Sequence, residues 1–410
     1  MKPPRVTALL LGAVLGCSSA APSRPDAGVE DEEDTGTPTG GTGGAPRDAR
    51  ASTTGGATGA DGPAGGTSGA DAAPPSPDGP APTTAAPLLS LLAQFTAADV
   101  PKQGPMESPP TPRSWTAPET LPMHPGKGLA EHPFLYAGEG FNTIFLVADG
   151  KVIWSYASAP GGEIDDVWML SNGHILYSHS NFLEELTPKK EVVWHHALPA
   201  GTESHSLQPI GLDKVLFMQN GQPARIILMN KTTKAMEIEH VITDAGANTH
   251  PQFRRVRLTA AGTYLAPYLS QRKIVEFDKD FKIIWTYPVA DMGTPWSALR
   301  LRNGNTLIQD EHNKAAREVN PKGEIVWEFK PTDLPAGLMR SSPQTCERLA
   351  NGNTVMFSPG KNVNNVQAVE VNVAKEVVWV LQDWKDLGPA TTAQFLDQPG
   401  IPENPGDLIH

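Results

Sequence analysis

The sequence predicts an all-β protein, a six-bladed β-propeller of four-stranded blades, because three short patterns repeat along its second half. The first pattern is two apolar residues followed by tryptophan, and it places Trp154, Trp194, Trp285, Trp327 and Trp379. Successive tryptophans are separated by 40, 91, 42 and 52 residues, and the gap of 91 corresponds to two repeats. A repeat of about 45 residues is typical of propeller blades.

The other two patterns are turns at fixed places within each repeat. A turn residue stands seven positions before each of the last four tryptophans, at Thr187, Asp278, Asn320 and Asn372. Asn230 has the same place in the repeat that lacks a tryptophan, where Glu237 stands instead. Pairs such as Asn303-Gly304 precede the second strand of several repeats, and both residues of such a pair tolerate the positive φ of a tight hairpin. Each repeat is therefore predicted to contain four strands with the tryptophan on the outermost.

The first blade is incomplete at its own position in the chain. Complete repeats begin near Ile164, His205, Gln252, Trp296 and Pro343. Residues 134–156 contain only three predicted strands, whereas residues 392–396 form a predicted strand without neighbours. We expect this last strand to become the innermost strand of the first blade, because closing the ring removes exposed sheet edges. The repeated tryptophans are expected to pack between neighbouring blades and not to form an active site.

Residues 1–17 have the features of a bacterial export signal. Lys2 and Arg5 precede an apolar run, and Gly16 precedes Cys17, an order typical of a secretory signal. The residues around Cys17 resemble a lipobox, which implies a lipid attached to this cysteine and an anchor in the outer membrane of a Gram-negative bacterium, facing periplasm or cell surface. Ordinary signal cleavage nearby is the alternative.

The remaining chain divides by composition. Residues 18–86 are rich in Ala, Gly, Pro, Ser, Thr and Asp, too poor in apolar surface to fold, and are predicted to be a disordered tether. Residues 87–132 are predicted to form a short helix and an irregular lead-in, and 133–410 the propeller. The net charge is −12, without a stripe of Lys and Arg, so nucleic acid is not an expected partner. Apart from Cys17 the chain has only Cys346, which we expect to be a buried small hydrophobe.

A functional site is expected at the mouth of the central channel, where the innermost strands of all blades converge. The residues that stand near the starts of these strands, and that we predict to bind a ligand or to act in catalysis, are Glu163, Asp165, Glu203, His205, Gln208, His250, Gln252, Arg254, Trp296 and Gln344.

Three kinds of chemistry fit this set. His205 and His250 can ligate a divalent metal together with nearby amide or carboxylate oxygens. Alternatively, one histidine is a nucleophile or general base, with Arg254 neutralising an anionic substrate. Trp296 can also offer a stacking face to a sugar or an aromatic group. A fourth interpretation is structural: the polar groups bond channel water or the backbone of the next blade.

The motifs at 302–308, 319–327 and 349–355 resemble those of bacterial PQQ-like repeats and of arylsulfotransferase-type propellers, over about residues 133–400. The resemblance implies blades and does not specify an activity. Quinone enzymes of this kind have eight blades and a pair of adjacent cysteines, which this chain lacks, so bound quinone is not expected. The sulfotransferases carry the transferred group on a channel histidine, a role that the resemblance would give to His205 or His250. We therefore expect a lipoprotein that binds a small molecule, a glycan or a protein at its axial face. The alternative is an axial-histidine enzyme, either arylsulfotransferase-like or a metal-assisted lyase. A third class is an inert scaffold.

Overall fold

The computed structural model describes residues 78–79, 82, 86–101, 132–139, 142–287, 293–338, 340, 342–360, 365–383 and 387–410. The chain divides into two units, 1–70 and 71–410, and every described residue belongs to the second. The predicted signal with Cys17, nearly all of the predicted tether and most of the lead-in therefore lie outside the described residues. Within the described ranges, no helix is long and apolar enough to span a membrane.

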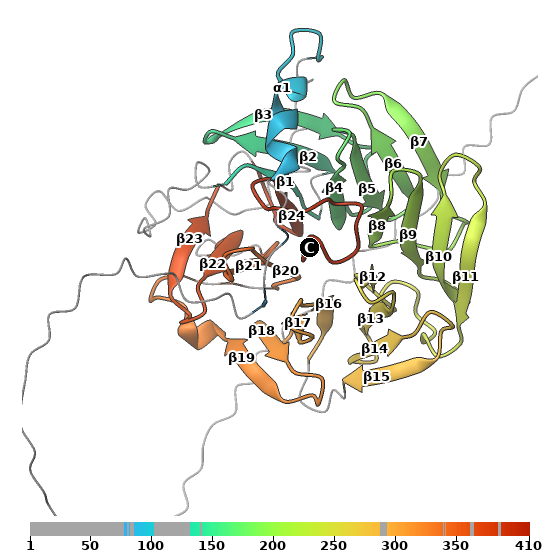
Figure 1. The fold of residues 1–410 in the computed structure, drawn as a ribbon, viewed down its shortest axis with the longest axis vertical. Coiled ribbons are helices and arrows are strands. Elements are labelled where there is room, and N and C mark those ends of the chain that lie inside the picture. Colours follow the sequence, from blue (N-terminus) through green and yellow to red (C-terminus); the bar gives the residue numbers. More distant parts are fainter. Residues whose placement is uncertain are drawn as a thin grey trace, which may run out of the picture. The chain divides into compact units, whose positions relative to one another are not determined.

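Six four-stranded antiparallel sheets surround a central axis, which confirms the predicted six-bladed β-propeller (Figure 1). From the axis outward, blade 1 contains β24 (Thr392–Phe395), β1 (Phe134–Ala137), β2 (Thr143–Ala148) and β3 (Lys151–Ala157), and blade 2 contains β4 (Asp166–Met169), β5 (Ile175–His179), β6 (Phe182–Leu186) and β7 (Val192–Ala197). Blade 3 contains β8 (Leu207–Ile210), β9 (Lys214–Gln219), β10 (Ala224–Asn230) and β11 (Met236–Ile242), and blade 4 contains β12 (Arg257–Leu258), β13 (Tyr264–Tyr268), β14 (Lys273–Phe277) and β15 (Ile283–Tyr287). Blade 5 contains β16 (Pro295–Arg300), β17 (Thr306–Asp310), β18 (Ala315–Val319) and β19 (Ile325–Phe329), and blade 6 contains β20 (Thr345–Arg348), β21 (Thr354–Phe357), β22 (Ala368–Val371) and β23 (Val377–Leu381).

The ring closes as predicted, by pairing of strands from the two ends of the propeller sequence. β24 lies antiparallel to β1, with Phe395 opposite Phe134 and Thr392 opposite Ala137. The other five blades are each built from four consecutive strands. Blade 1 is therefore the only one of these six whose innermost strand comes from the far end of the chain.

The repeated tryptophans lie on the outermost strands. Their hydrogen bonds explain why the tryptophan pattern and the turn pattern recur with the same spacing. The indole N–H of Trp154 donates to the carbonyl oxygen of Pro188 at 2.8 Å, that of Trp285 to Pro321 at 3.0 Å, and that of Trp327 to Val373 at 3.1 Å. Each acceptor directly follows the turn residue of the next blade. The two sequence patterns are thus the two sides of one contact between neighbouring blades.

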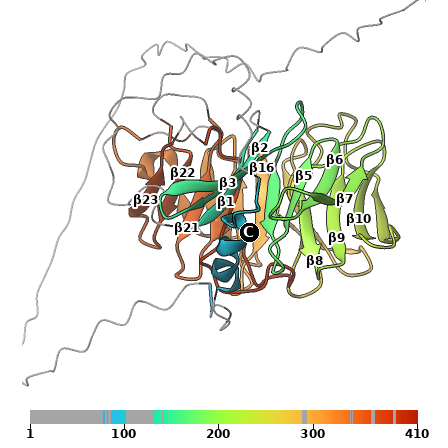
Figure 2. The same ribbon diagram turned by 90° about the horizontal axis from the view of Figure 1, so that it is seen from above.

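A short helical segment packs against blades 1 and 2 at one face of the ring (Figure 2). It consists of the 3-10 helix η1 (Pro87–Leu91) and the α-helical turn α1 (Leu92–Phe95). Leu88 and Phe95 are buried, and the Phe95 ring meets the Trp154 ring edge-on, with centroids 5.6 Å apart. A second 3-10 turn, η3 (Pro331–Asp333), follows blade 5.

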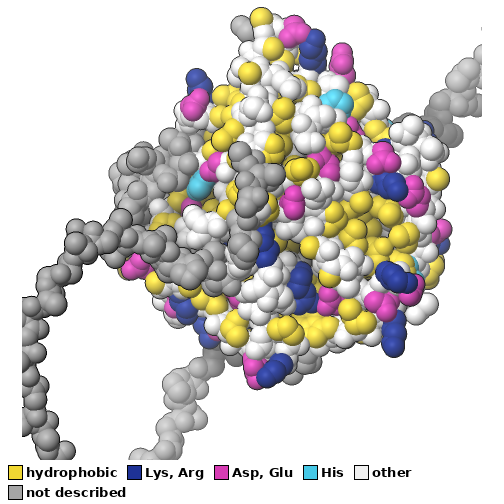
Figure 3. Space-filling view, viewed as in Figure 1, with side chains coloured by type: hydrophobic (Ala, Val, Ile, Leu, Met, Phe, Trp, Pro, Cys, Tyr) yellow, Lys and Arg dark blue, Asp and Glu magenta, His cyan; other side chains and the backbone are white. Residues whose placement is uncertain are grey.

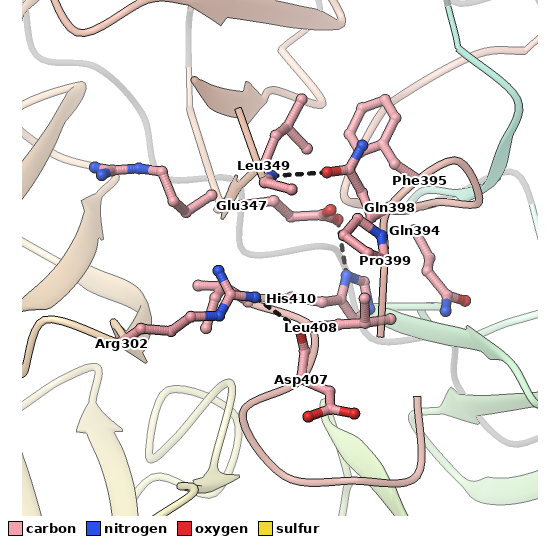
Figure 4. A pocket seen from close by; sticks show the side chains of 13 residues that line it. Arg302, Glu347, Leu349, Gln394, Phe395, Gln398, Pro399, Asp407, Leu408 and His410 are labelled. Carbon is pink, nitrogen blue, oxygen red and sulfur yellow. Dashed lines mark hydrogen bonds and ion pairs between the residues drawn. The ribbon is translucent and has the colours of Figure 1, made fainter. Parts of the chain in front are cut away.

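The last residues of the chain, 397–410, occupy the channel at the rim where the innermost strands end, and we call them the tail (Figures 1 and 4). Gln398 accepts from the Ala350 N–H at 2.8 Å, and Glu403 from the Ser171 N–H at 2.7 Å. His410 lies deeper and is buried, with Nδ1 2.7 Å from Glu347 Oε1. The space left between tail and channel wall holds no more than about one water molecule. The repeat pattern did not predict this segment, which leaves the opposite rim as the candidate mouth.

The face of the ring that carries the tail is mixed in charge. On the face shown in Figure 3, Lys and Arg side chains are scattered among Asp and Glu and form no stripe.

Cys346 lies buried in β20, where burial raises the pKa of its thiol to about 12. It therefore behaves as the expected core residue, since a thiol with this pKa is not a nucleophile at neutral pH.

Two tryptophans provide a matched test of the contact between blades. Trp154 and Trp194 are both buried, but the Trp194 Nε1 atom has no hydrogen-bond partner among the described residues. Replacing either with phenylalanine removes similar volume, whereas only Trp154→Phe removes a hydrogen bond. We expect Trp154→Phe to lower the free energy of unfolding by about 1 kcal/mol more than Trp194→Phe does, measured by chemical denaturation. Equal losses would show that the indole bond contributes nothing.

Candidate functional site

The candidate site lies at the rim where the innermost strands begin. Glu163 and Asp165 precede β4, Glu203 and His205 precede β8, and His250 and Arg254 precede β12. Because all innermost strands run in the same direction along the axis, residues from three consecutive blades meet here. The structure brings together these six predicted site residues.

His205 is the centre of the group. Its side chain is fully buried, with Nδ1 2.6 Å from Asp165 Oδ2 and 3.3 Å from Glu163 Oε2, and Nε2 3.1 Å from Glu203 Oε2. Burial and the charge of Arg254 lower the pKa of His205, but the three carboxylates outweigh them and raise this pKa to about 10. His205 is therefore an imidazolium that holds three carboxylates in place, and neither of its nitrogens is available to a metal or a substrate.

The pKa values of the three carboxyl groups are shifted in different directions because the surroundings of the groups differ. Hydrogen bonds from His205 and His250 hold the pKa of Glu203 well below its usual range. Burial opposes ionisation of Glu163, yet the interaction with the charged His205 ring, whose Nδ1 lies 3.3 Å from Oε2, prevails and lowers the pKa of Glu163 to about 2. Burial and the charge of Glu163 raise the pKa of Asp165. The rim thus presents Glu163 and Glu203 as ionised acceptors, with 27% and 31% of their side chains exposed.

His250 is the accessible histidine, with 49% of its side chain exposed. Its Nδ1 lies 2.9 Å from Glu203 Oε2, and its Nε2 lies 3.1 Å from the Nη2 of Arg254. A guanidinium only donates, so Nε2 accepts and the proton of the neutral ring is on Nδ1. The carboxylate and the guanidinium together fix the tautomer of His250 and the direction of its ring.

The guanidinium of Arg254 packs against the ring of Trp296. The guanidinium carbon lies 4.9 Å from the centroid of the Trp296 ring, and this tryptophan is buried. Arg254 also donates to the carbonyl oxygen of His250 at 2.5 Å. Trp296 therefore supports Arg254 in this structure and does not offer the predicted stacking face to a ligand.

The three predicted glutamines divide between blade contacts and the rim. Gln208 bonds the backbone N–H and carbonyl of Leu258 at 2.7 and 3.2 Å, and Gln252 bonds those of Gly221 at 2.8 and 3.0 Å. Both amides join blades 3 and 4, so the structure does not bring them into the site. Gln344 belongs to the rim, because its Nε2 donates to Glu139 at 2.5 Å.

Glu139 and Glu311 are rim residues that the sequence analysis missed. They follow β1 and β17, the second strands of their blades, which end where the innermost strands begin. Burial, with the charges of Glu163 and Asp165, raises the pKa of Glu139 to about 8, and burial raises that of Glu311 to about 7. A polar residue one or two positions after a second strand is the signal that identifies them.

In the described part of the chain, two overlapping groups of side chains have the spacing of metal ligands. One consists of Glu163, His205 and His250, and the other of Glu139, Glu163 and Asp165. The first includes His205, which would have to lose its proton and its carboxylate partners before its nitrogen bound a metal. A metal site that uses the imidazole of His205, as the sequence suggested, would therefore require His205 to break its contacts with the carboxylates around it.

The two histidines are expected to differ sharply when they are removed. His205→Ala leaves buried carboxylates without their cation and should lower the free energy of unfolding by about 3–5 kcal/mol. His250→Ala removes a half-exposed contact and should cost about 1 kcal/mol or less. Chemical denaturation of both variants measures the difference, and equal costs would contradict the structural role assigned to His205.

Comparison with known proteins supports the fold. No protein-family model and no curated protein matches the chain. A protein of unknown function from Bacteroides caccae is 23% identical, with 64% of this chain and 97% of that chain covered and a TM-score of 0.57. A streptogramin B lyase is 15% identical, with 64% of this chain and 85% of that chain covered and a TM-score of 0.46. A virginiamycin B lyase from Staphylococcus aureus is 12% identical, with 65% of this chain and 93% of that chain covered and a TM-score of 0.47. At 23% identity the likeness to the Bacteroides caccae protein shows a shared fold alone, and at their TM-scores the two lyases carry no argument.

Proposed function

We propose that this propeller binds a small polar molecule with several hydrogen-bond donors, such as a sugar, at its axial mouth. The observation that carries the proposal is the pair of ionised, part-exposed carboxylates of Glu163 and Glu203, held rigid from behind by the buried imidazolium of His205. Carboxylates fixed in this way accept bonds from adjacent hydroxyl groups without first losing side-chain freedom, which favours binding.

The charge of the rim selects among ligands. Glu163 and Glu203 face the opening, whereas the cationic groups His205 and Arg254 are buried and already paired with neighbours. An anionic ligand would meet the two carboxylates first and be repelled. A neutral polyhydroxyl ligand is therefore favoured over a sulfated phenol.

An enzyme is the second candidate, and the contact between Glu203 and His250 favours it. A carboxylate that orients a half-exposed imidazole is the arrangement of a general base or of a histidine nucleophile. If the resemblance to arylsulfotransferase-type propellers extends to activity, His250 and not His205 carries the group, and Arg254 must release Nε2 when an anionic substrate binds.

We test the binding proposal by thermal unfolding of the purified chain with sugars, polyols and sulfated phenols. A ligand at about a hundredfold excess over its Kd adds about 2.7 kcal/mol to the free energy of unfolding. Stabilisation by a sugar should disappear in Glu203→Gln and persist in Glu191→Gln, an exposed glutamate on the outer part of blade 2. No stabilisation by any neutral compound, together with turnover of a sulfated phenol that His250→Gln abolishes, would favour the enzyme instead.

We also propose that the propeller is anchored to the outer membrane through lipidated Cys17 and residues 18–86. The support is the sequence order of basic residues, apolar run and cysteine. A coil of ~65 residues has a typical end-to-end distance of roughly 45 Å, enough to hold the propeller off the bilayer.

Cys17→Ala is expected to release the protein from the membrane fraction of a Gram-negative host and to abolish labelling by a fatty-acid analogue. Ser18→Ala is the matched control, because it leaves the cysteine in place. Retention of Cys17→Ala in the membrane fraction would contradict the anchor and would favour ordinary cleavage or a protein partner.

A further inference from the structure

Three carboxyl groups from blades 1 and 2 converge at the rim, and one of them, Glu163, also belongs to the proposed ligand site. Glu139 follows β1, and Glu163 and Asp165 precede β4; one oxygen atom from each lies within 4.8 Å of the others. None of these ligand atoms is a nitrogen. The group therefore differs in chemistry from the histidine site that the sequence suggested.

Several oxygens around this point accept no hydrogen bond although they are buried. Asp165 is fully buried; its Oδ2 faces His205 at 2.6 Å, while its Oδ1 has no partner among the described residues. Glu163 Oε2 also lacks a hydrogen bond, because the His205 N–H that lies 3.3 Å away points to Asp165. Buried acceptors are nearly always satisfied in folded proteins, so such a set indicates a bound ion or water.

Gln344 provides an independent sign of the same kind. This side chain comes from blade 6 and is almost fully buried; its Nε2 donates to Glu139, and its Oε1 has no partner among the described residues. A side chain that contacts Glu139 thus carries a buried amide oxygen without a donor among the described residues. Amide and carboxylate oxygens are together the ligands of hard cations.

The cationic side chains nearby are directed elsewhere. His205 approaches Asp165 from the side of Oδ2. Arg254 bonds His250 and lies over Trp296, and Arg255 bonds the backbone carbonyl of Asp165 and the hydroxyl of Thr392. Among the described residues, neither arginine forms an ion pair with Glu139, Glu163 or Asp165.

We propose that Glu139, Glu163 and Asp165 bind one calcium ion, with the amide of Gln344 beside it. Calcium takes oxygen ligands at about 2.3–2.6 Å, so its ligands lie up to roughly 5 Å apart, which the observed spacing satisfies. Magnesium binds its ligands at shorter distances and usually keeps several waters, so a group of three protein carboxylates favours calcium. His205 orients Asp165 through its other oxygen, as partners behind metal-ligating carboxylates commonly do. The ion would link blades 1 and 2 at the mouth and does not require the organic ligand proposed above.

The test is calorimetric titration of the full chain, freed of metal with EDTA, with CaCl2, MgCl2 and ZnCl2 in turn. We expect one calcium per chain, bound at least about tenfold tighter than magnesium, and a higher melting temperature with calcium. Glu139→Gln should weaken calcium binding by about tenfold or more, because it removes one ligand charge. Glu311→Gln, a change at another carboxyl of the rim, is the control and should alter the affinity by less than about twofold.

Three results would overturn the proposal: no heat and no change in melting with calcium, equal weakening by Glu139→Gln and Glu311→Gln, or a preference for zinc that His250→Gln removes. A melting curve of the metal-free Glu139→Gln variant checks that this variant folds. If it does not fold, Glu163→Gln replaces it in the calcium titration. Glu203→Gln should leave the calcium stoichiometry unchanged while abolishing sugar binding. A failure of the ligand proposal is thereby distinguished from a failure of the calcium proposal.

Discussion

The pairing of β24 with β1 is the contact on which the rest of the arrangement depends. It places a strand from the end of the chain innermost in a blade that otherwise comes from the beginning of the propeller. Without it, blade 1 would have three strands and an exposed edge, and the ring would be open. Because β24 lies at the axis and ends at Phe395, the residues after it emerge at the rim where the innermost strands end, and the tail occupies the channel there. Closure of the ring therefore also decides which rim is left for a site.

At the remaining rim, the common direction of the innermost strands concentrates charge. Side chains that are distant in sequence, such as Asp165 and His205, meet because each stands just before its strand. Burying a carboxylate is costly unless it is paired. His205 meets this cost for three carboxylates at once, since both of its nitrogens face acidic oxygens. The exposed acceptors Glu163 and Glu203 are consequently fixed in position before any ligand arrives.

The repeats were sufficient to predict the fold, because blade length, turn residues and tryptophans recur in several blades. The pattern therefore remains readable where one member is missing, as at Glu237. They also placed most rim residues, since position relative to an innermost strand follows from the repeat. They did not separate His205 from His250, because burial depends on which neighbouring blade covers each ring. Gln208 was assigned to the site although its amide bonds the next blade, and Glu139 was missed because only the first strand of each blade was considered. The tail has no repeat pattern, so nothing in its residues predicted its place in the channel.

Binding and catalysis make different demands on the same rim. As a base or nucleophile, His250 needs the lone pair on Nε2, and that lone pair is occupied by Arg254. Arg254 is itself held by the ring of Trp296 and by the carbonyl oxygen of His250, so freeing Nε2 requires a group that displaces a supported guanidinium. An anionic substrate could do so only after passing the carboxylates of Glu163 and Glu203. A ligand that donates hydrogen bonds meets acceptors that are already in place, and this difference in required movement is the physical reason for preferring binding over turnover.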